Sequence, residues 1–173
     1  MIAAAYHTPD GFDDLLMSSD GKALTGLHFA GSGVGCRQVS DRDARELPAF
    51  RETCRWLDIY FGGRHPDFTP PYRIEGLTPF RRAVIAEMLR IPFGGTVTYG
   101  EIASAIARRR GAAKMSAQAV GGAVGWNPIC IIIPCHRVIG AGGRLVGYGG
   151  GIGNKIALLA LEGHGMIERG DAK

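Results

Sequence analysis

The sequence lacks the features that mark membrane, secreted and zinc-binding proteins. It has no run of about eighteen or more apolar residues, which excludes an ordinary membrane-spanning helix. Residues 1–11 lack the basic region and long apolar stretch of a secretory signal, so we expect a cytoplasmic protein without membrane contact. The four cysteines form no CxxC pair, and we therefore expect reduced thiols and no structural zinc.

Acidic residues are scarce in the second part of the chain. Residues 1–76 hold 8 Lys+Arg against 11 Asp+Glu, whereas residues 77–173 hold 12 against 5. A basic surface on one segment is typical of a phosphate-binding module, although a solvated basic face without a partner gives the same count. With 173 residues, 46% of them hydrophobic, the chain can bury one large core or two small ones.

The first part of the chain predicts a small sheet covered by one helix. Short apolar segments separated by turn sequences favour a β-meander, and a longer segment with helical spacing ends at Gly62-Gly63. Pro66–Gly76 carries three of the nine prolines and no periodicity, so we place a domain boundary there. The expected strands lie in 2–7, 11–18 and 23–29, and the helix in 42–61 carries Leu47, Phe50, Cys54, Leu57 and Phe61 on one face.

Helical signals dominate after the boundary. Thr78 is an N-cap followed by Pro79, Thr98 and Glu101 form a capping box, and Ser116 can cap a further helix. The second and third of the expected helices, 98–106 and 117–124, are joined by the basic linker 108–111 and resemble a helix-turn-helix. The fold class is therefore α+β: an N-terminal α/β domain, 1–76, and a C-terminal domain, 77–173, with a winged helix-turn-helix character. The expected helices span 79–90, 98–106, 117–124 and 154–162.

The second helix of this pair, SAQAVGGAVG, is almost free of large side chains. Such a smooth helix lets its backbone come very close to a partner. Packing against a neighbouring helix and docking on a DNA groove explain the composition equally well.

One cysteine has unusual neighbours. The apolar run Ile129–Ile133 predicts a buried strand, which delivers the chain to Pro134, Cys135 and His136, and the glycine-rich loop 140–153 follows. A histidine or an electropositive setting lowers a thiol pKa and activates the sulfur as a nucleophile. Sequence adjacency alone still favours a buried structural cysteine, and core packing is the default for Cys36, Cys54 and Cys130.

Several motifs in order resemble one known family. The stretch Ile133–Val138, IPCHRV, is similar to the active-site signature of the methylated-DNA–protein-cysteine methyltransferases, which are also called O6-alkylguanine-DNA alkyltransferases. The likeness extends from Thr78 to Gly163. Further matching motifs are Val97–Ala103, Ala119–Ala123, Asn127-Pro128 and Leu158–Gly163.

The resemblance implies direct-reversal DNA repair without a cofactor. In the family, a damaged nucleotide is flipped out of the duplex, and the alkyl group of O6-alkylguanine moves irreversibly to a cysteine, once per molecule. Cys135 would be the acceptor, His136 and Glu162 the proton relay, and Tyr99 the donor to the departing guanine. Asn127 would tie the helix-turn-helix to the active-site segment, although it also fits a structural turn before Pro128.

The resemblance also implies a monomer that binds double-stranded DNA from the minor groove with little sequence preference. Gln118 stands where well-known members carry an arginine that fills the space of the flipped base. Arg108–Arg110 are further phosphate partners, and a solvated charge run is the alternative. The expected DNA contacts are Lys114, Ser116, Ala117, Gln118, Ala119, Gly121 and Arg137, and the expected pocket loop residues are Tyr148 and Gly149.

Two other functions compete with this interpretation. A damage sensor of the alkyltransferase-like kind would bind DNA without transfer, but those relatives lack the reactive cysteine that this chain has. A thiol hydrolase using Cys135 and His136 would need an oxyanion hole, for which no motif is present.

Overall fold

The computed structural model describes residues 1–31 and 46–165, and the chain separates into two units. Unit 1 comprises Met1–Glu75 together with Pro128–Ile132, and unit 2 comprises Gly76–Asn127 and the chain from Ile133 onward. None of the helices in the described ranges is both long and apolar enough to cross a membrane. The α+β class predicted from the sequence is confirmed.

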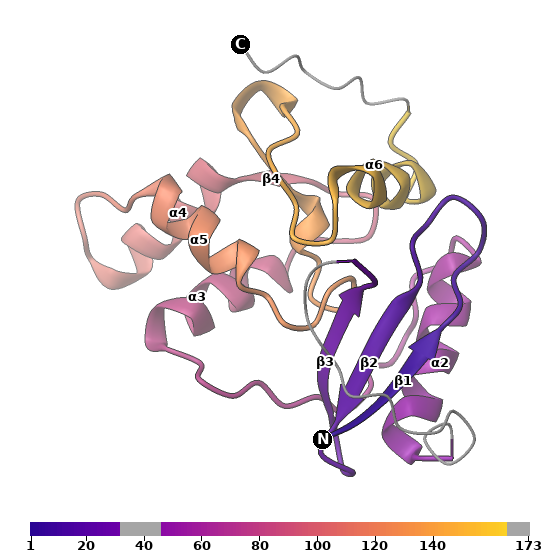
Figure 1. The fold of residues 1–173 in the computed structure, drawn as a ribbon. Coiled ribbons are helices and arrows are strands. Elements are labelled where there is room, and N and C mark those ends of the chain that lie inside the picture. Colours follow the sequence, from indigo (N-terminus) through magenta and orange to yellow (C-terminus); the bar gives the residue numbers. More distant parts are fainter. Residues whose placement is uncertain (32–45, 166–173) are drawn as a thin grey trace. The chain divides into compact units, whose positions relative to one another are not determined.

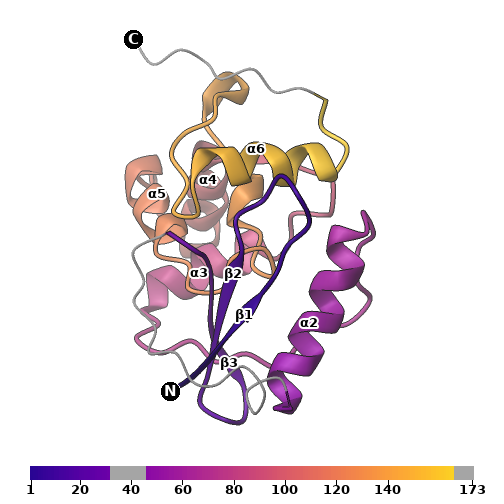
Figure 2. The same cartoon turned by 45° about the vertical axis from the view of Figure 1, so that its right-hand side comes forward.

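Unit 1 is built on a three-stranded antiparallel meander, as predicted. Strands β1 (Ile2–Tyr6), β2 (Leu15–Ser19) and β3 (Leu24–Phe29) lie in the order β1-β2-β3. Helix α2 (Pro48–Phe61) contacts β2 and β3 and runs beside the sheet in both views (Figure 1 and Figure 2). The core therefore lies between one helix and one sheet face.

The buried face of α2 differs from the predicted one. Phe50 and Leu57 are fully buried, but Cys54 and Phe61 are only half-buried, because Trp56 and Tyr60 occupy the stripe that faces the core. Residues 42–45, which the prediction included in this helix, and Cys36 lie outside the described residues. Cys130, in contrast, is buried as expected.

The described part of unit 2 holds four α-helices, two short 3-10 helices and a pair of very short strands. The predicted caps are present: Thr78 Oγ1 accepts from Arg81 N, Ser116 Oγ accepts from Ala119 N, and Thr98 with Glu101 forms a complete capping box. The helices are α3 (Pro79–Met88), α4 (Tyr99–Arg110), α5 (Ala117–Gly125) and α6 (Ile152–Leu161). The strands β4 (Val97–Thr98) and β5 (Val138–Ile139) pair in parallel.

Helix α4 is longer than the sequence predicted. It continues to Arg110 and ends at Gly111, whose left-handed φ of 63° suits glycine. Arg108–Arg110 therefore form its last turn and are not a linker, and positive charge is favourable at the C-terminal end of a helix.

The predicted strand Ile129–Ile133 is wrong. Ile129 makes one isolated bridge with Leu27 inside unit 1, and the chain then turns. Ile131 has a φ of 68°, and Ile132 N donates to Cys130 O at 2.8 Å, which closes a three-residue turn that is rare for a β-branched residue. The run is apolar because it is buried, and its backbone is not extended.

Candidate active site and nucleic-acid interface

A sharp turn positions Cys135. Pro134 has φ −81° and ψ 62°, and Cys135 N donates to Ile133 O at 2.8 Å, which is an inverse γ-turn. The short 3-10 helix η1 (Cys135–Arg137) begins directly after it. Because the chain reverses here, the consecutive residues Cys135, His136 and Arg137 face different neighbours within unit 2.

The Cys135 sulfur is buried but has polar neighbours. The residue is only 4% exposed. Asn127 Nδ2 lies 3.1 Å from Sγ and 2.9 Å from Ile133 O, so one amide group both holds the turn and donates to the sulfur. Tyr148 Oη lies 3.9 Å from Sγ. A hydrogen-bond donor aimed at the sulfur favours its thiolate form, which an apolar pocket would disfavour.

Glu162 lies at the centre of a buried polar cluster. It is the C-cap residue of α6, and its carboxylate accepts from His136 Nε2 at 2.7 Å and from the backbone N–H of Gly94 at 3.0 Å. Arg137 donates to the same carboxylate through Nε at 2.8 Å and Nη2 at 2.9 Å, and it donates through Nη1 to Ile91 O at 2.9 Å. Such a bidentate pair fixes the carboxylate in place.

Burial keeps His136 neutral. Burial lowers the pKa of His136, with smaller contributions from the charges of Arg137 and Lys155, while the hydrogen bond to Glu162 acts in the opposite direction. A carboxylate can only accept, so Nε2 of the neutral imidazole carries the hydrogen and Nδ1 carries the lone pair. His136 is thereby suited to take up a proton on the side away from Glu162.

Tyr99 is the first residue of α4 and stays protonated. Burial raises the pKa of Tyr99, and negative charge on Cys135 raises it further. Its phenol is therefore a hydrogen-bond donor at neutral pH.

A pocket of about 530 Å³ connects Tyr99 with α5 and the glycine-rich loop of unit 2. Its walls combine the first turns of two helices with the tip of that loop. The lining residues are Thr98, Tyr99, Gly100, Ala117, Gln118, Gly121, Ala141, Val146 and Gly147. Three of the predicted DNA contacts therefore share one cavity with the predicted proton donor.

The smooth side of α5 is open. Val120, Ala123 and Val124 face the interior, where α5 contacts α3 and α4. On the other side Gln118 is exposed, and a Cβ added to Gly122 would meet no described atom within 4 Å. Helix packing therefore explains only the buried side, and the small residues of the open side need another explanation. Ser116, Ala117 and Ala119 are exposed as well, and Gly121 packs against the Tyr99 ring.

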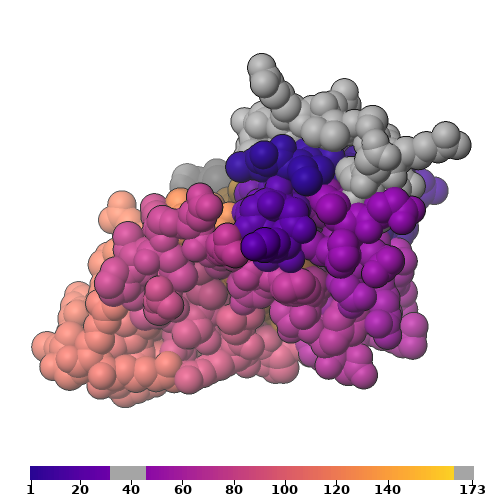
Figure 3. All heavy atoms as spheres, turned by 90° about the horizontal axis from the view of Figure 1, so that it is seen from below, coloured from indigo at the N-terminus to yellow at the C-terminus, as the bar shows by residue number. Residues whose placement is uncertain are grey.

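The basic side chains near α5 fall into two groups. Arg109 pairs with Glu87, and Arg110 donates to Pro79 O at 3.3 Å, so both are held within unit 2. Arg108 and Lys114 are exposed and form no ion pair with the described residues. The segment between α4 and α5, in salmon, reaches the edge of the face shown in Figure 3.

One predicted DNA contact is wrong. The Arg137 side chain is buried, and Glu162 and Ile91 O take up its donors. A phosphate cannot reach this guanidinium. No local pattern predicts this pairing, because Glu162 lies 25 residues from Arg137 in the chain.

The glycine-rich loop brings Tyr148 toward Cys135, whereas Gly149 lies beside the end of α5. A Cβ on Gly149 would lie 3.7 Å from Gly125 O, at the end of α5. The loop also meets a residue that the sequence analysis missed, Lys155, whose Nζ donates to Val146 O at 3.3 Å. A lysine in the first turn of the otherwise apolar segment IGNKIALLAL was the available signal.

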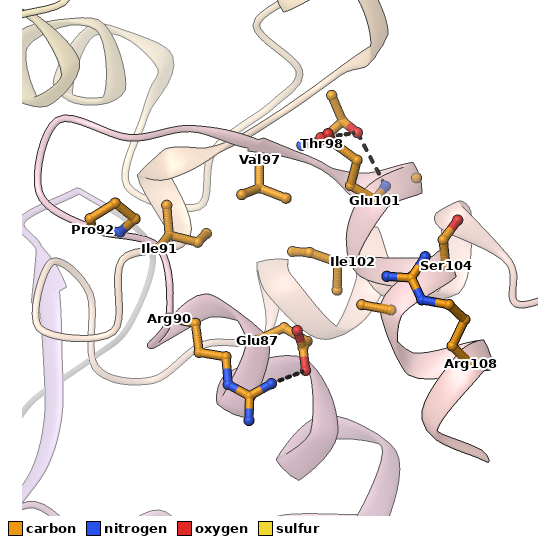
Figure 4. A pocket seen from close by; sticks show the side chains of 12 residues that line it. Glu87, Arg90, Ile91, Pro92, Val97, Thr98, Glu101, Ile102, Ser104 and Arg108 are labelled. Carbon is orange, nitrogen blue, oxygen red and sulfur yellow. Dashed lines mark hydrogen bonds and ion pairs between the residues drawn. The ribbon is translucent and has the colours of Figure 1, made fainter.

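A second pocket in unit 2 contains none of the predicted catalytic residues, although the predicted phosphate partner Arg108 lines it. It has a volume of about 800 Å³ and lies between α3, the segment 90–98 and α4. Figure 4 shows Arg90 and Glu87 pointing toward one another at one side of it, and Glu101 is engaged in the α4 capping box. Both carboxylates of this pocket, Glu87 and Glu101, are therefore already engaged with protein groups. Among the described residues, no cluster of three His, Cys, Asp or Glu side chains could hold a metal ion.

Comparisons with known proteins point to one family. The profile described as "6-O-methylguanine DNA methyltransferase, DNA binding domain" matches residues 79–164. A methylated-DNA–protein-cysteine methyltransferase of Mycobacterium leprae is 40% identical over 88% of this chain and 88% of its own length. One from Methanosarcina acetivorans is 39% identical over 94% and 99%. The crystal structure of Mycobacterium tuberculosis OGT in complex with DNA superposes with a TM-score of 0.78 at 38% identity, covering 94% of this chain and 92% of that one.

Proposed function

Because the chain belongs to the methylated-DNA–protein-cysteine methyltransferase family, we propose that it repairs DNA by moving the alkyl group of O6-alkylguanine onto its own Cys135. The observation that carries the proposal is the Asn127 amide that donates to the Cys135 sulfur, beside a histidine that burial keeps neutral. This combination supports a thiolate and a base in one place.

The transfer step follows from these groups. His136 receives the thiol proton through water, and Glu162 stabilises the imidazolium that forms. The thiolate attacks the alkyl carbon, an S–C bond forms, and the C–O bond breaks with its electron pair on guanine. Tyr99 donates to the departing base, and the net reaction moves one alkyl group to sulfur and one proton to guanine. The Glu162 carboxylate also holds the imidazole of His136 in one orientation through their hydrogen bond, as the carboxylate of a Ser-His-Asp triad does.

The base must leave the duplex to reach this site, since Cys135 is buried. We propose that the pocket between Tyr99, Gln118 and the loop receives it. Gln118 would occupy the space left in the stack, with less stacking surface than arginine and no charge. Tyr148 would lie over the alkyl group, and Gly149 would leave room beside α5.

The open side of α5 would enter the minor groove of double-stranded DNA. Its small residues permit close approach, and its N-terminal backbone amides and Lys114 would contact phosphates. Because such contacts carry little base readout, binding should depend weakly on sequence and strongly on salt. A monomer suffices, since the proposed site lies entirely in unit 2.

Stoichiometry tests the proposal. A thioether is a very poor leaving group, so each molecule should act once. With a duplex that carries O6-methylguanine in excess, the repaired base should reach one mole per mole of active protein and then stop. Continued turnover would indicate a hydrolase or demethylase, and binding without repair would indicate a damage sensor.

A further inference from the structure

Lys155 is a fully buried lysine in an unfavourable place. It is the fourth residue of α6 and is 0% exposed, although lysine is almost never fully buried without a partner. The first turn of a helix also carries partial positive charge, which opposes an ammonium. Both effects disfavour a cation here, so its contacts must account for its presence.

The contacts of Lys155 join two segments of the site. Nζ donates to Val138 O at 2.7 Å and to Val146 O at 3.3 Å. Val138 follows η1 directly and begins β5, so it belongs to the segment that holds Cys135. Val146 belongs to the glycine-rich loop and lines the pocket of Tyr99 and Gln118. One ammonium thus ties the pocket loop to the segment of the acceptor thiol.

Tyr148 belongs to the same loop as Val146 and reaches toward the Cys135 segment. Its ring centroid is 6.0 Å from Lys155 Nζ, and its hydroxyl is 3.9 Å from Cys135 Sγ. The loop around it contains seven glycines among residues 140–151, and glycine holds a backbone conformation poorly by itself. A link at Val146 therefore restrains the position of Tyr148.

The charge of Lys155 also acts on the thiol. Among the described residues, the ionisable groups with which it interacts are Cys135 and His136 of η1, and the Tyr148 ring lies beside it. Burial lowers the pKa of Lys155 to about 8, and negative charge on Cys135 opposes that shift. The ammonium is therefore still largely present at pH 7. The attraction is mutual, so the ammonium favours the thiolate.

We propose that Lys155 is a positioning residue for alkyl transfer: its buried ammonium ties the loop that carries Tyr148 to the Cys135 segment and places a positive charge beside the Tyr148 ring, whose hydroxyl approaches the sulfur. The role in alkyl transfer rests on the proposed function. The contacts themselves can be tested without DNA.

The test compares Lys155→Met, Lys155→Arg and, as a matched control, the exposed Lys22→Met in the full-length chain. Iodoacetamide alkylation of Cys135 is followed against pH, with peptide mass spectrometry to separate it from the other cysteines. Loss of a nearby opposite charge should raise the midpoint of this profile by about one pH unit in Lys155→Met. Lys155→Arg should keep the midpoint near that of the wild type, and Lys22→Met should not change it.

The same variants are then measured in single-turnover methyl transfer. At pH 7, Lys155→Met should transfer more slowly, by up to about tenfold, since a rise of one unit in the thiol pKa lowers the thiolate fraction by at most that factor, with duplex affinity unchanged. A shifted alkylation profile without any transfer by the wild type would support the effect of Lys155 on the Cys135 thiol and refute the proposed function. An unchanged alkylation profile in folded Lys155→Met would overturn the inference, and so would a shift that Lys155→Arg fails to reverse.

A measurement on the wild type covers the case in which Lys155→Met does not fold. Hydrogen exchange of the loop peptide 141–151, corrected for intrinsic rates, is compared at pH 7 and pH 9. Bonds from an ammonium are about twice as strong as those from a neutral donor, so protection should fall as Lys155 loses its proton. Equal protection at both pH values would contradict the loop restraint.

Discussion

At the scale of single residues, the site buries an ion pair and an uncharged histidine in one cluster. Arg137 and Glu162 form a buried bidentate ion pair, whereas burial favours the neutral form of His136. Each state depends on residues far apart in sequence. The protonation states that the proposed chemistry needs are therefore properties of the packed cluster.

Arg137→Ala should affect stability before it affects DNA binding. Removing one partner of a buried pair leaves Glu162 poorly compensated, and we expect a loss of about 3–5 kcal/mol in the free energy of unfolding. Urea denaturation measures this. The exposed Arg64→Ala, in unit 1, should stay within about 0.5 kcal/mol of the wild type. Normal stability with weakened duplex binding would restore Arg137 as a phosphate contact.

The neutral state of His136 predicts a pH dependence. Its pKa in the folded chain lies below the ordinary value of 6.5, so below about pH 6.5 the unfolded chain binds a proton that the folded chain does not. Stability should therefore fall with decreasing pH, by at most about 1.4 kcal/mol per pH unit from this group, until the folded pKa is passed. The difference between the wild type and His136→Asn isolates the effect, and equal pH slopes in the two proteins would show that His136 is charged when folded.

At the scale of elements, local signals were predicted well and non-local ones poorly. The caps at Thr78, Thr98 and Ser116 act within one helical turn, so the sequence showed them. The pairing of β4 with β5 joins residues about forty apart and spans only two residues on each strand, too short for a pattern. In the run Ile129–Ile133, burial and β-branching imitate a strand, whereas Ile131 turns the chain.

The candidate site divides in the same way. Cys135, His136, Glu162, Tyr99 and Asn127 were found through the family resemblance, and their roles stay predictions. Physical reasoning from the residues alone favoured a structural cysteine, because adjacency says nothing about geometry. Asn127 reaches the sulfur only because the γ-turn at Pro134 brings the chain back.

Two substitutions at Gly122 test helix α5: one should raise its stability, and the other should weaken duplex binding. Gly122→Ala should stabilise the helix by about 0.5–1 kcal/mol, because glycine is a poor helix former and the new Cβ meets open space. Gly122→Leu should weaken duplex binding at least tenfold if this side meets the groove. Ala160→Leu, on the exposed side of α6, is the control. Undiminished binding by Gly122→Leu would exclude the open side of α5 from the interface.

At the scale of the whole molecule, charge is divided along the chain. Residues 1–76 carry a net charge near −3 and residues 77–173 one near +7. The division into domains 1–76 and 77–173 stays a prediction, and residues 128–132 group with unit 1 in the structure. All residues of the proposed transfer site belong to unit 2, where the positive charge is concentrated.

This distribution predicts which lysine contributes to salt dependence. Each phosphate contact adds about 0.9 to the slope of log affinity against log salt concentration, so Lys114→Ala should lower that slope by about 0.9. The change should be the same for unrelated DNA sequences, because phosphate contacts carry no base information. Lys22→Ala serves as the control. A slope unchanged by Lys114→Ala would assign Lys114 to the solvated surface.

The central claim is that one sulfur accepts the alkyl group, and the site of modification tests it most directly. The wild-type protein is incubated with a duplex bearing isotopically labelled O6-methylguanine and then digested for peptide mass spectrometry. The account predicts one labelled methyl group on Cys135, none on Cys36, Cys54 or Cys130, and no transfer by a folded Cys135→Ala variant. Repaired DNA beside an unmodified Cys135 would contradict it.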